Sequence, residues 1–143
     1  MAQVVLGLYV MTMFGGAYLI SFTTGIGRPD STARATALPP LVTFTHPLLA
    51  LSGLAVWLVF MAEGSAYLAW TSVVVLLATA ALGDVLALRT FHAKPQHVRV
   101  GPGREPADFQ RAEKQMPHSV IAVHGILAVA TIAMAVVTAI MAG

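Results

Sequence analysis

The stretch from Leu41 to Met61, LVTFTHPLLALSGLAVWLVFM, decides the fold because it contains no acidic or basic residue apart from one histidine. A helix of about 20 apolar residues matches the hydrocarbon thickness of a bilayer, so this stretch predicts a membrane-spanning helix. Pro39 and Pro40 precede it, and proline suits the first turn of a helix, where its missing N–H is not needed. The span therefore runs from about Pro40 to Met61.

Three further apolar runs of similar length flank this stretch. They cover about residues 4–22, 66–88 and 118–142. Only four residues, which include Glu63, Gly64 and Ser65, separate the second span from the third, so these two spans must be antiparallel neighbours. The sequence predicts an all-α integral membrane protein, a single four-helix bundle made of two helical hairpins.

The composition agrees with this class. The chain has 143 residues, of which 57% are hydrophobic and 10% charged, against roughly 25% charged residues in soluble domains. A soluble fold is excluded. The chain contains no cysteine, which also excludes disulfides, thiolate metal sites and haem attached through thioethers. Any redox chemistry would need a cofactor held in another way.

The basic residues mark one side of the membrane. All eight Lys and Arg residues lie in the loops that follow the first and third spans. With four spans these loops share one face, which the positive-inside rule assigns to the cytoplasm. We expect a multi-pass protein of the cell (plasma) membrane with both termini extracytoplasmic. Apart from Phe91 and Phe109, the aromatic residues lie in the spans, so lipid is the expected partner and nucleic acid is not.

The loop at 89–117 is expected to end in a short helix. Phe109, Ala112 and Met116 recur at helical spacing after Pro106. This pattern predicts a surface helix that lies on the membrane with its apolar side down. A solvated linker is the alternative.

The sequence around His46 recurs around His124. The segments HPLLALSGLA and HGILAVATIA, which begin at these histidines, share their first, fourth, fifth and tenth residues. His46 lies six residues past Pro40 and His124 seven past Pro117, about 9 to 10 Å into the bilayer at 1.5 Å per residue. Both spans run in the same direction, so an approximate two-fold axis along the membrane normal would turn both imidazoles inward at one depth.

The helical neighbours of the two histidines are mostly small. They are Thr43, Ala50 and Gly53 on the second span, and Ala128 and Thr131 on the fourth. Small residues serve either close helix packing or a flat ligand that needs the space. The sequence leaves both interpretations open.

One carboxylate lies at a similar depth. Asp84 precedes Arg89 by five residues, which places it about 7 Å inside the same boundary. An ionisable residue in a span costs about 2.5 to 3.5 kcal/mol on insertion scales, so its presence indicates function. We expect Asp84 to face the bundle interior, because a lipid-facing carboxylate would have no partner.

The first functional hypothesis is a b-type haem (heme b) between the second and fourth spans, near the cytoplasmic face. His46 and His124 would be its axial iron ligands, because bis-histidine ligation needs two imidazoles at one depth. Arg28, Arg34 or Arg89 would meet the propionates. The chain would then act in electron transport, and is not expected to be an enzyme by itself.

Two alternatives remain. In the first, His46, His124 and Asp84 together bind a Zn or Fe ion, whereas in the haem hypothesis Asp84 only lies beside the ligands. In the second, the chain is a non-catalytic scaffold or accessory subunit of a membrane complex, or a homo-oligomer. The histidines would then hydrogen-bond across helices. Their expected partners are Thr45, Ser52, Thr131 or Asp84.

The four spans and the paired histidines resemble small bacterial membrane cytochromes b, including the four-helix b561-like proteins and the haem-carrying anchor subunits of respiratory enzymes. The resemblance covers the number of spans and the two histidines only. The b561-like proteins commonly bind two haems near opposite faces, whereas the outer halves of these spans contain no histidine. The resemblance therefore implies one intramembrane haem at most.

Two further groups of residues predict packing. Trp57, Tyr67 and Trp70 cluster near the outer ends of the second and third spans and suggest an interfacial aromatic belt. Gly15 and Gly16 in the first span offer a close-packing face, suited to another subunit.

Overall fold

The structure is a computed structural model that describes residues 1–26, 36, 38–92 and 112–143. Within these residues the regular elements are the helices α1 (Ala2–Thr24), α2 (Pro40–Glu63), α3 (Ala66–Phe91), α4 (Ala112–Gln115) and α5 (His118–Ala142). All except the one-turn α4 are long and apolar enough to cross a membrane. The predicted all-α class with four membrane-spanning helices is confirmed.

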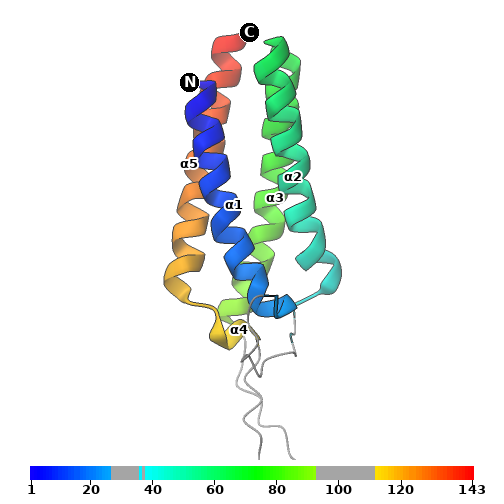
Figure 1. Cartoon of the computed structure of the whole chain (residues 1–143), viewed down its shortest axis with the longest axis vertical. Coiled ribbons are helices and arrows are strands. Elements are labelled where there is room, and N and C mark those ends of the chain that lie inside the picture. Colours follow the sequence, from blue (N-terminus) through cyan, green and yellow to red (C-terminus); the bar gives the residue numbers. More distant parts are fainter. Residues whose placement is uncertain (27–35, 37, 93–111) are drawn as a thin grey trace, which may run out of the picture.

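Both chain termini lie at one end of the bundle, and α4 lies at the other end (Figure 1). The two loops that carry the basic residues connect the long helices at the α4 end. We call this the loop end and the opposite one the terminal end.

Glycines end the helices α1 and α2. Backbone φ is +71° at Gly25 and at Gly64, which follow α1 and α2. This left-handed conformation is open to glycine without steric cost, so it ends a helix there. Only Gly64 and Ser65 separate α2 from α3, and these two helices pack against each other along their length.

The four long helices pack as two pairs, α1 with α5 and α2 with α3 (Figure 1). The pairs meet mainly through α3 and α5. The sequence predicted a hairpin of the first and second spans, but α1 and α2 make few contacts with each other. This order of neighbours places α2 and α5 at opposite corners of the bundle, and likewise α1 and α3.

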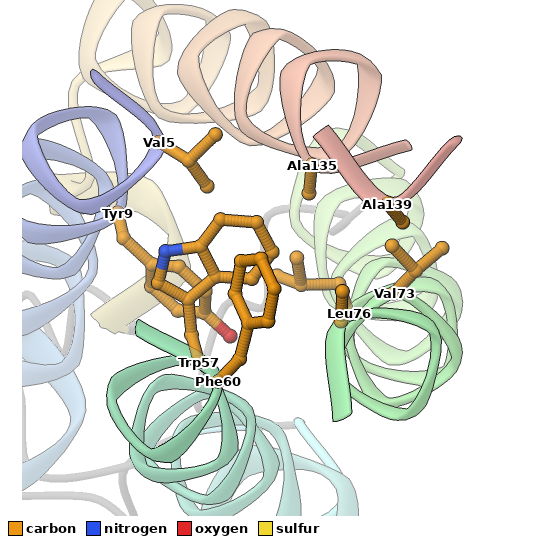
Figure 2. Packing of buried hydrophobic residues seen from close by; sticks show 9 residues of the cluster. Val5, Tyr9, Trp57, Phe60, Val73, Leu76, Ala135 and Ala139 are labelled. Atoms are coloured by element: carbon orange, nitrogen blue, oxygen red, sulfur yellow. The ribbon is translucent and has the colours of Figure 1, made fainter. Parts of the chain in front are cut away.

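The terminal end contains the larger core (Figure 2). Its buried members are Val5, Tyr9, Trp57, Phe60, Ala69, Val73, Leu76, Ala135 and Ala139. Trp57 is completely buried, and its indole Nε1 donates to the Ala2 carbonyl at 3.3 Å. The expectation that Trp57 belongs to an interfacial aromatic belt is wrong, because its ring is buried and turns toward α1. Tyr67 and Trp70 are exposed.

A smaller cluster lies at the loop end. Ala112 and Met116 are buried there against Phe22 and Leu38. The expectation that the apolar side of the short helix rests on the membrane is therefore wrong for these two residues, since protein covers them. Phe109, which contributed to that expectation, lies outside the described residues.

Candidate functional site

His46 on α2 and His124 on α5 face each other across the bundle. Their ring centroids are 6.2 Å apart, and the ring planes are inclined at 71°. Both residues are half-buried. The structure thus brings together the two histidines that the sequence paired.

Each imidazole is held by a backbone carbonyl of the neighbouring helix. His46 Nδ1 lies 2.9 Å from the Thr79 oxygen on α3, and His124 Nδ1 lies 3.0 Å from the Thr12 oxygen on α1. A carbonyl oxygen only accepts, so Nδ1 carries the proton in both rings. A neutral imidazole protonated at Nδ1 keeps a lone pair on Nε2, the nitrogen that a metal would bind.

On α3, a glycine lets the ring of His46 approach the helix backbone. Gly83 follows Thr79 by four residues. A Cβ atom at Gly83 would lie 3.0 Å from His46 Cε1. Any larger residue would push the ring away from the Thr79 carbonyl.

The same arrangement recurs on α1. Gly16 follows Thr12 by four residues, and a Cβ there would lie 3.2 Å from His124 Cε1. A Cβ at Gly15 would lie 3.3 Å from His124 Nδ1. The close-packing face expected at these glycines is therefore used within the chain, by His124. The sequence analysis missed both contacts, although the spacing Thr-x-x-x-Gly in the first and third spans would have revealed them.

Gly53 does not leave room for a ligand. The space where its Cβ would sit is filled by the Tyr9 hydroxyl and by Val75, and its carbonyl accepts a hydrogen bond from Ser72 Oγ at 3.0 Å. Of the two interpretations of the small residues, close helix packing therefore holds at this position.

The Tyr9 hydroxyl was also missed by the sequence analysis. It is buried and has no hydrogen-bond partner among the described residues. The nearby Ser72 hydroxyl donates its own proton to the Gly53 carbonyl. Nothing in the spacing of the first span singled out Tyr9.

The other small neighbours of the histidines are Thr43, Ala50, Ala128 and Thr131. Ala50 and Ala128 are half-buried. Thr43 is buried and donates its hydroxyl to the Pro39 carbonyl of its own helix at 3.0 Å. Thr131 is buried as well, and its Oγ1 donates to the carbonyl four residues earlier at 2.7 Å. Both threonine hydroxyls are thus satisfied without a ligand.

Asp84 lies at the loop end but points away from the site. Its side chain is exposed, so the expectation that it faces the interior is wrong. Thr79 and Gly83 face His46, and each further residue of a helix turns by about 100°. Position 84 is therefore rotated outward. The distance to the next arginine gave the depth of Asp84 but not its direction.

The structure does not assemble the predicted three-ligand metal site. Among the described residues, no group of three His, Cys, Asp or Glu side chains is placed to hold a metal ion. Because Asp84 points outward, only two of the three predicted ligands, His46 and His124, lie in the interior.

The expected hydrogen-bond partners of the scaffold hypothesis are not used either. Ser52 is exposed and donates to the Leu48 carbonyl of its own helix. The histidines bond to backbone carbonyls rather than to side chains.

The arginines expected near the site are only partly described. Arg89 is exposed in the last turn of α3, at the loop end. Arg28 and Arg34 lie outside the described residues.

The histidine pair fits ligation of a metal between the two rings. Two imidazoles on opposite sides of one metal, each bound through one nitrogen at about 2.0 to 2.1 Å, would have ring centroids roughly 6 Å apart. The observed separation is 6.2 Å. The donor set also fits, because both Nδ1 protons are bonded elsewhere and both Nε2 atoms keep their lone pairs.

Comparisons with protein-family models, with curated proteins and with solved structures find no match to this chain. The function is therefore argued from the chemistry of the site and not from relatives.

Proposed function

We propose that this chain is a small membrane protein of the b-type cytochrome kind that binds one haem b between α2 and α5. His46 and His124 would hold the iron through Nε2. The observation that supports the proposal is the facing pair of imidazoles, 6.2 Å apart, whose Nδ1 protons are both committed to backbone carbonyls. When bound, the haem would supply an iron centre that exchanges one electron.

The residues of the chain would restrict this chemistry to electron transfer. If both His46 and His124 held the iron, the chain would leave no iron position for an oxygen molecule and would supply electron transfer instead. Both ligands sit on long helices and are tied to a second helix, so their positions are defined before a cofactor binds. The site lies toward the loop end. Arg89, which is exposed there, would pair with a haem propionate.

We infer that the loop end is cytoplasmic and that both termini are outside the cell membrane. All eight basic residues follow the first or third long helix or lie in the last turn of α3, on the side of the loop end, and positive residues are retained in the cytoplasm. Reporter fusions to Gly143 test the orientation. An external reporter should be active there, and activity of a reporter that functions only in the cytoplasm would reverse the assignment.

A structural role is the second candidate, because the same hydrogen bonds support it. The histidines join α2 to α3 and α5 to α1 without any cofactor. Interhelical hydrogen bonds of this kind contribute about 0.6 to 2 kcal/mol each. The chain would then be an accessory subunit of a membrane complex.

The visible spectrum of the protein, purified in detergent after expression with ample haem, separates these functions. A Soret band with sharp reduced α and β bands is expected for six-coordinate haem. His46→Ala or His124→Ala should lose the haem or give a five-coordinate spectrum. The exposed His118 provides the matched control, and His118→Ala should keep the parent spectrum.

The other outcomes assign the other functions. A colourless protein with stoichiometric zinc or iron indicates a metal ion bound without porphyrin, and a colourless, metal-free protein indicates the structural role. If both His46→Ala and His124→Ala keep the parent spectrum, the haem proposal is wrong.

A further inference from the structure

We infer that Gly83 and Gly16 are positioning residues for the two proposed haem ligands, an inference that rests on the proposed function. Each glycine allows one imidazole to lie on the backbone of the neighbouring helix and to donate its Nδ1 proton there. This contact selects the tautomer whose Nε2 is free to bind iron.

The contact on α3 shows how the device works. The Thr79 carbonyl lies one helical turn before Gly83, and a carbonyl oxygen has two lone pairs, so it can accept from the helix and from His46 together. The His46 ring reaches this oxygen by passing over Gly83, where a Cβ would approach Cε1 to 3.0 Å. Real Cβ contacts this short are rare, so an added methyl group would move the ring by a few tenths of an ångström.

The contact on α1 repeats the same chemistry. His124 donates to the Thr12 carbonyl at 3.0 Å and lies over Gly15 and Gly16. The two helices that carry the glycines, α1 and α3, occupy opposite corners of the bundle, as do the two helices that carry the histidines. Each helix pair therefore positions one ligand.

The chemical consequence concerns the iron. A hydrogen bond from Nδ1–H raises the basicity of the imidazole as a ligand, and loss of such a bond typically weakens metal affinity about 10- to 100-fold. A more basic ligand favours oxidised iron over reduced iron. The glycine contacts should therefore lower the reduction potential of bound haem and increase its affinity.

Other helical glycines provide the matched controls. Gly125 follows His124 directly on α5, yet a Cβ there would meet no atom within 4 Å, and the same holds for Gly7 on α1. Alanine is the better helix former, so it should be tolerated at both positions. A loss of ligand positioning in Gly83→Ala or Gly16→Ala then comes from the contact with the ring and not from the helix propensity of alanine.

The test compares Gly83→Ala and Gly16→Ala with Gly125→Ala. The first measurement is ¹⁵N NMR of the histidine side chains in the haem-free protein, which reports which ring nitrogen carries the proton. Gly83→Ala should change the tautomer signals of His46 and leave those of His124 in place, and Gly16→Ala should do the reverse. Gly125→Ala should leave both rings unchanged.

The second measurement is haem binding. Gly83→Ala and Gly16→Ala should each lower the haem affinity about 10- to 100-fold and raise the reduction potential. Gly125→Ala should keep the parent values. If Gly16→Ala does not fold, the same measurements on Gly15→Ala test the His124 contact, because the expected approach there is milder at 3.3 Å.

The two proposals fail in different ways. Variants that keep the parent tautomer, affinity and potential overturn the inference even if the parent binds haem. A parent that never binds haem overturns the proposed function and the ligand role with it, while the NMR signals of the haem-free protein still show whether the glycines position the rings.

Discussion

Gly53→Ala should destabilise the bundle, and Tyr9→Phe should rescue it. An added methyl group at position 53 would collide with the Tyr9 hydroxyl and press on Val75 at 3.2 Å. Tyr9 is 2% exposed and cannot move away without disturbing the core at the terminal end. The collision therefore requires a shift of α1 against α2 or a strained side chain.

The expected magnitude follows from opposing terms. Overpacking a filled core costs about 1 to 3 kcal/mol, whereas replacing a helical glycine with alanine returns about 0.5 to 1 kcal/mol. Gly53→Ala should therefore lose about 1 kcal/mol. Tyr9→Phe removes a buried hydroxyl that has no hydrogen-bond partner among the described residues, and leaving such a group unpaired costs about 1 to 3 kcal/mol. The double variant should be at least as stable as the parent.

The assay is equilibrium unfolding in mixed detergent micelles, read as a double-mutant cycle with a coupling energy above about 1 kcal/mol. Gly125→Ala is the control for the intrinsic effect of alanine, since its Cβ would meet open space. The reasoning is refuted if Gly53→Ala is as stable as Gly125→Ala, or if Tyr9→Phe gives no rescue. Either result would mean that Gly53 leaves room after all and would reopen the ligand interpretation of this stretch.

Three further outcomes are expected in the same unfolding assay. Asp84→Asn should change the free energy of unfolding by less than about 0.5 kcal/mol, because the side chain is exposed, and a larger loss would reveal a partner. Trp57→Phe should cost about 1 to 3 kcal/mol through lost volume and the lost bond to Ala2, whereas Trp70→Phe, at an exposed position, should cost much less. Hemin at 100 times its Kd should stabilise the parent by about 2.7 kcal/mol, and His46→Ala should abolish this effect.

The spans were predictable because lipid imposes a simple rule. Every residue of a spanning segment must satisfy its backbone internally and tolerate hydrocarbon, so length and hydropathy suffice. The turn at Gly64 and Ser65 was also predictable, because two connecting residues are only enough for a tight hairpin between α2 and α3. These features depend only on neighbouring residues.

The direction of individual side chains was harder to predict. Depth follows from counting at 1.5 Å per residue, but direction depends on which helices become neighbours. The predicted depth of Asp84, near the loop end of α3, agrees with the structure. Its predicted direction is wrong, because the side chain is exposed. Trp57 is predicted in an interfacial belt although its ring fills the core, because an apolar helix shows no polar face that would mark its outside.

Which helices pack together was also not predictable, because apolar helices show no polar face that marks the outside of the bundle. Consecutive spans were expected to pack as hairpins, yet α1 packs mainly against α5. One signal in the sequence does agree with the observed pairing. Thr12 and Gly16 on α1, and Thr79 and Gly83 on α3, share one spacing and receive the two histidines.

A purely structural role explains each half of the site but not their combination. A histidine that only joins two helices needs one acceptor, and each ring already has one within its own helix pair. Nothing in such a role requires the two rings to face each other from opposite corners of the bundle at 6.2 Å. A ligand that binds both Nε2 atoms would require it, and would also connect the α1–α5 pair to the α2–α3 pair. The facing of the rings is therefore the property that a haem would use, whereas a structural role would use it only for an edge-to-face ring contact.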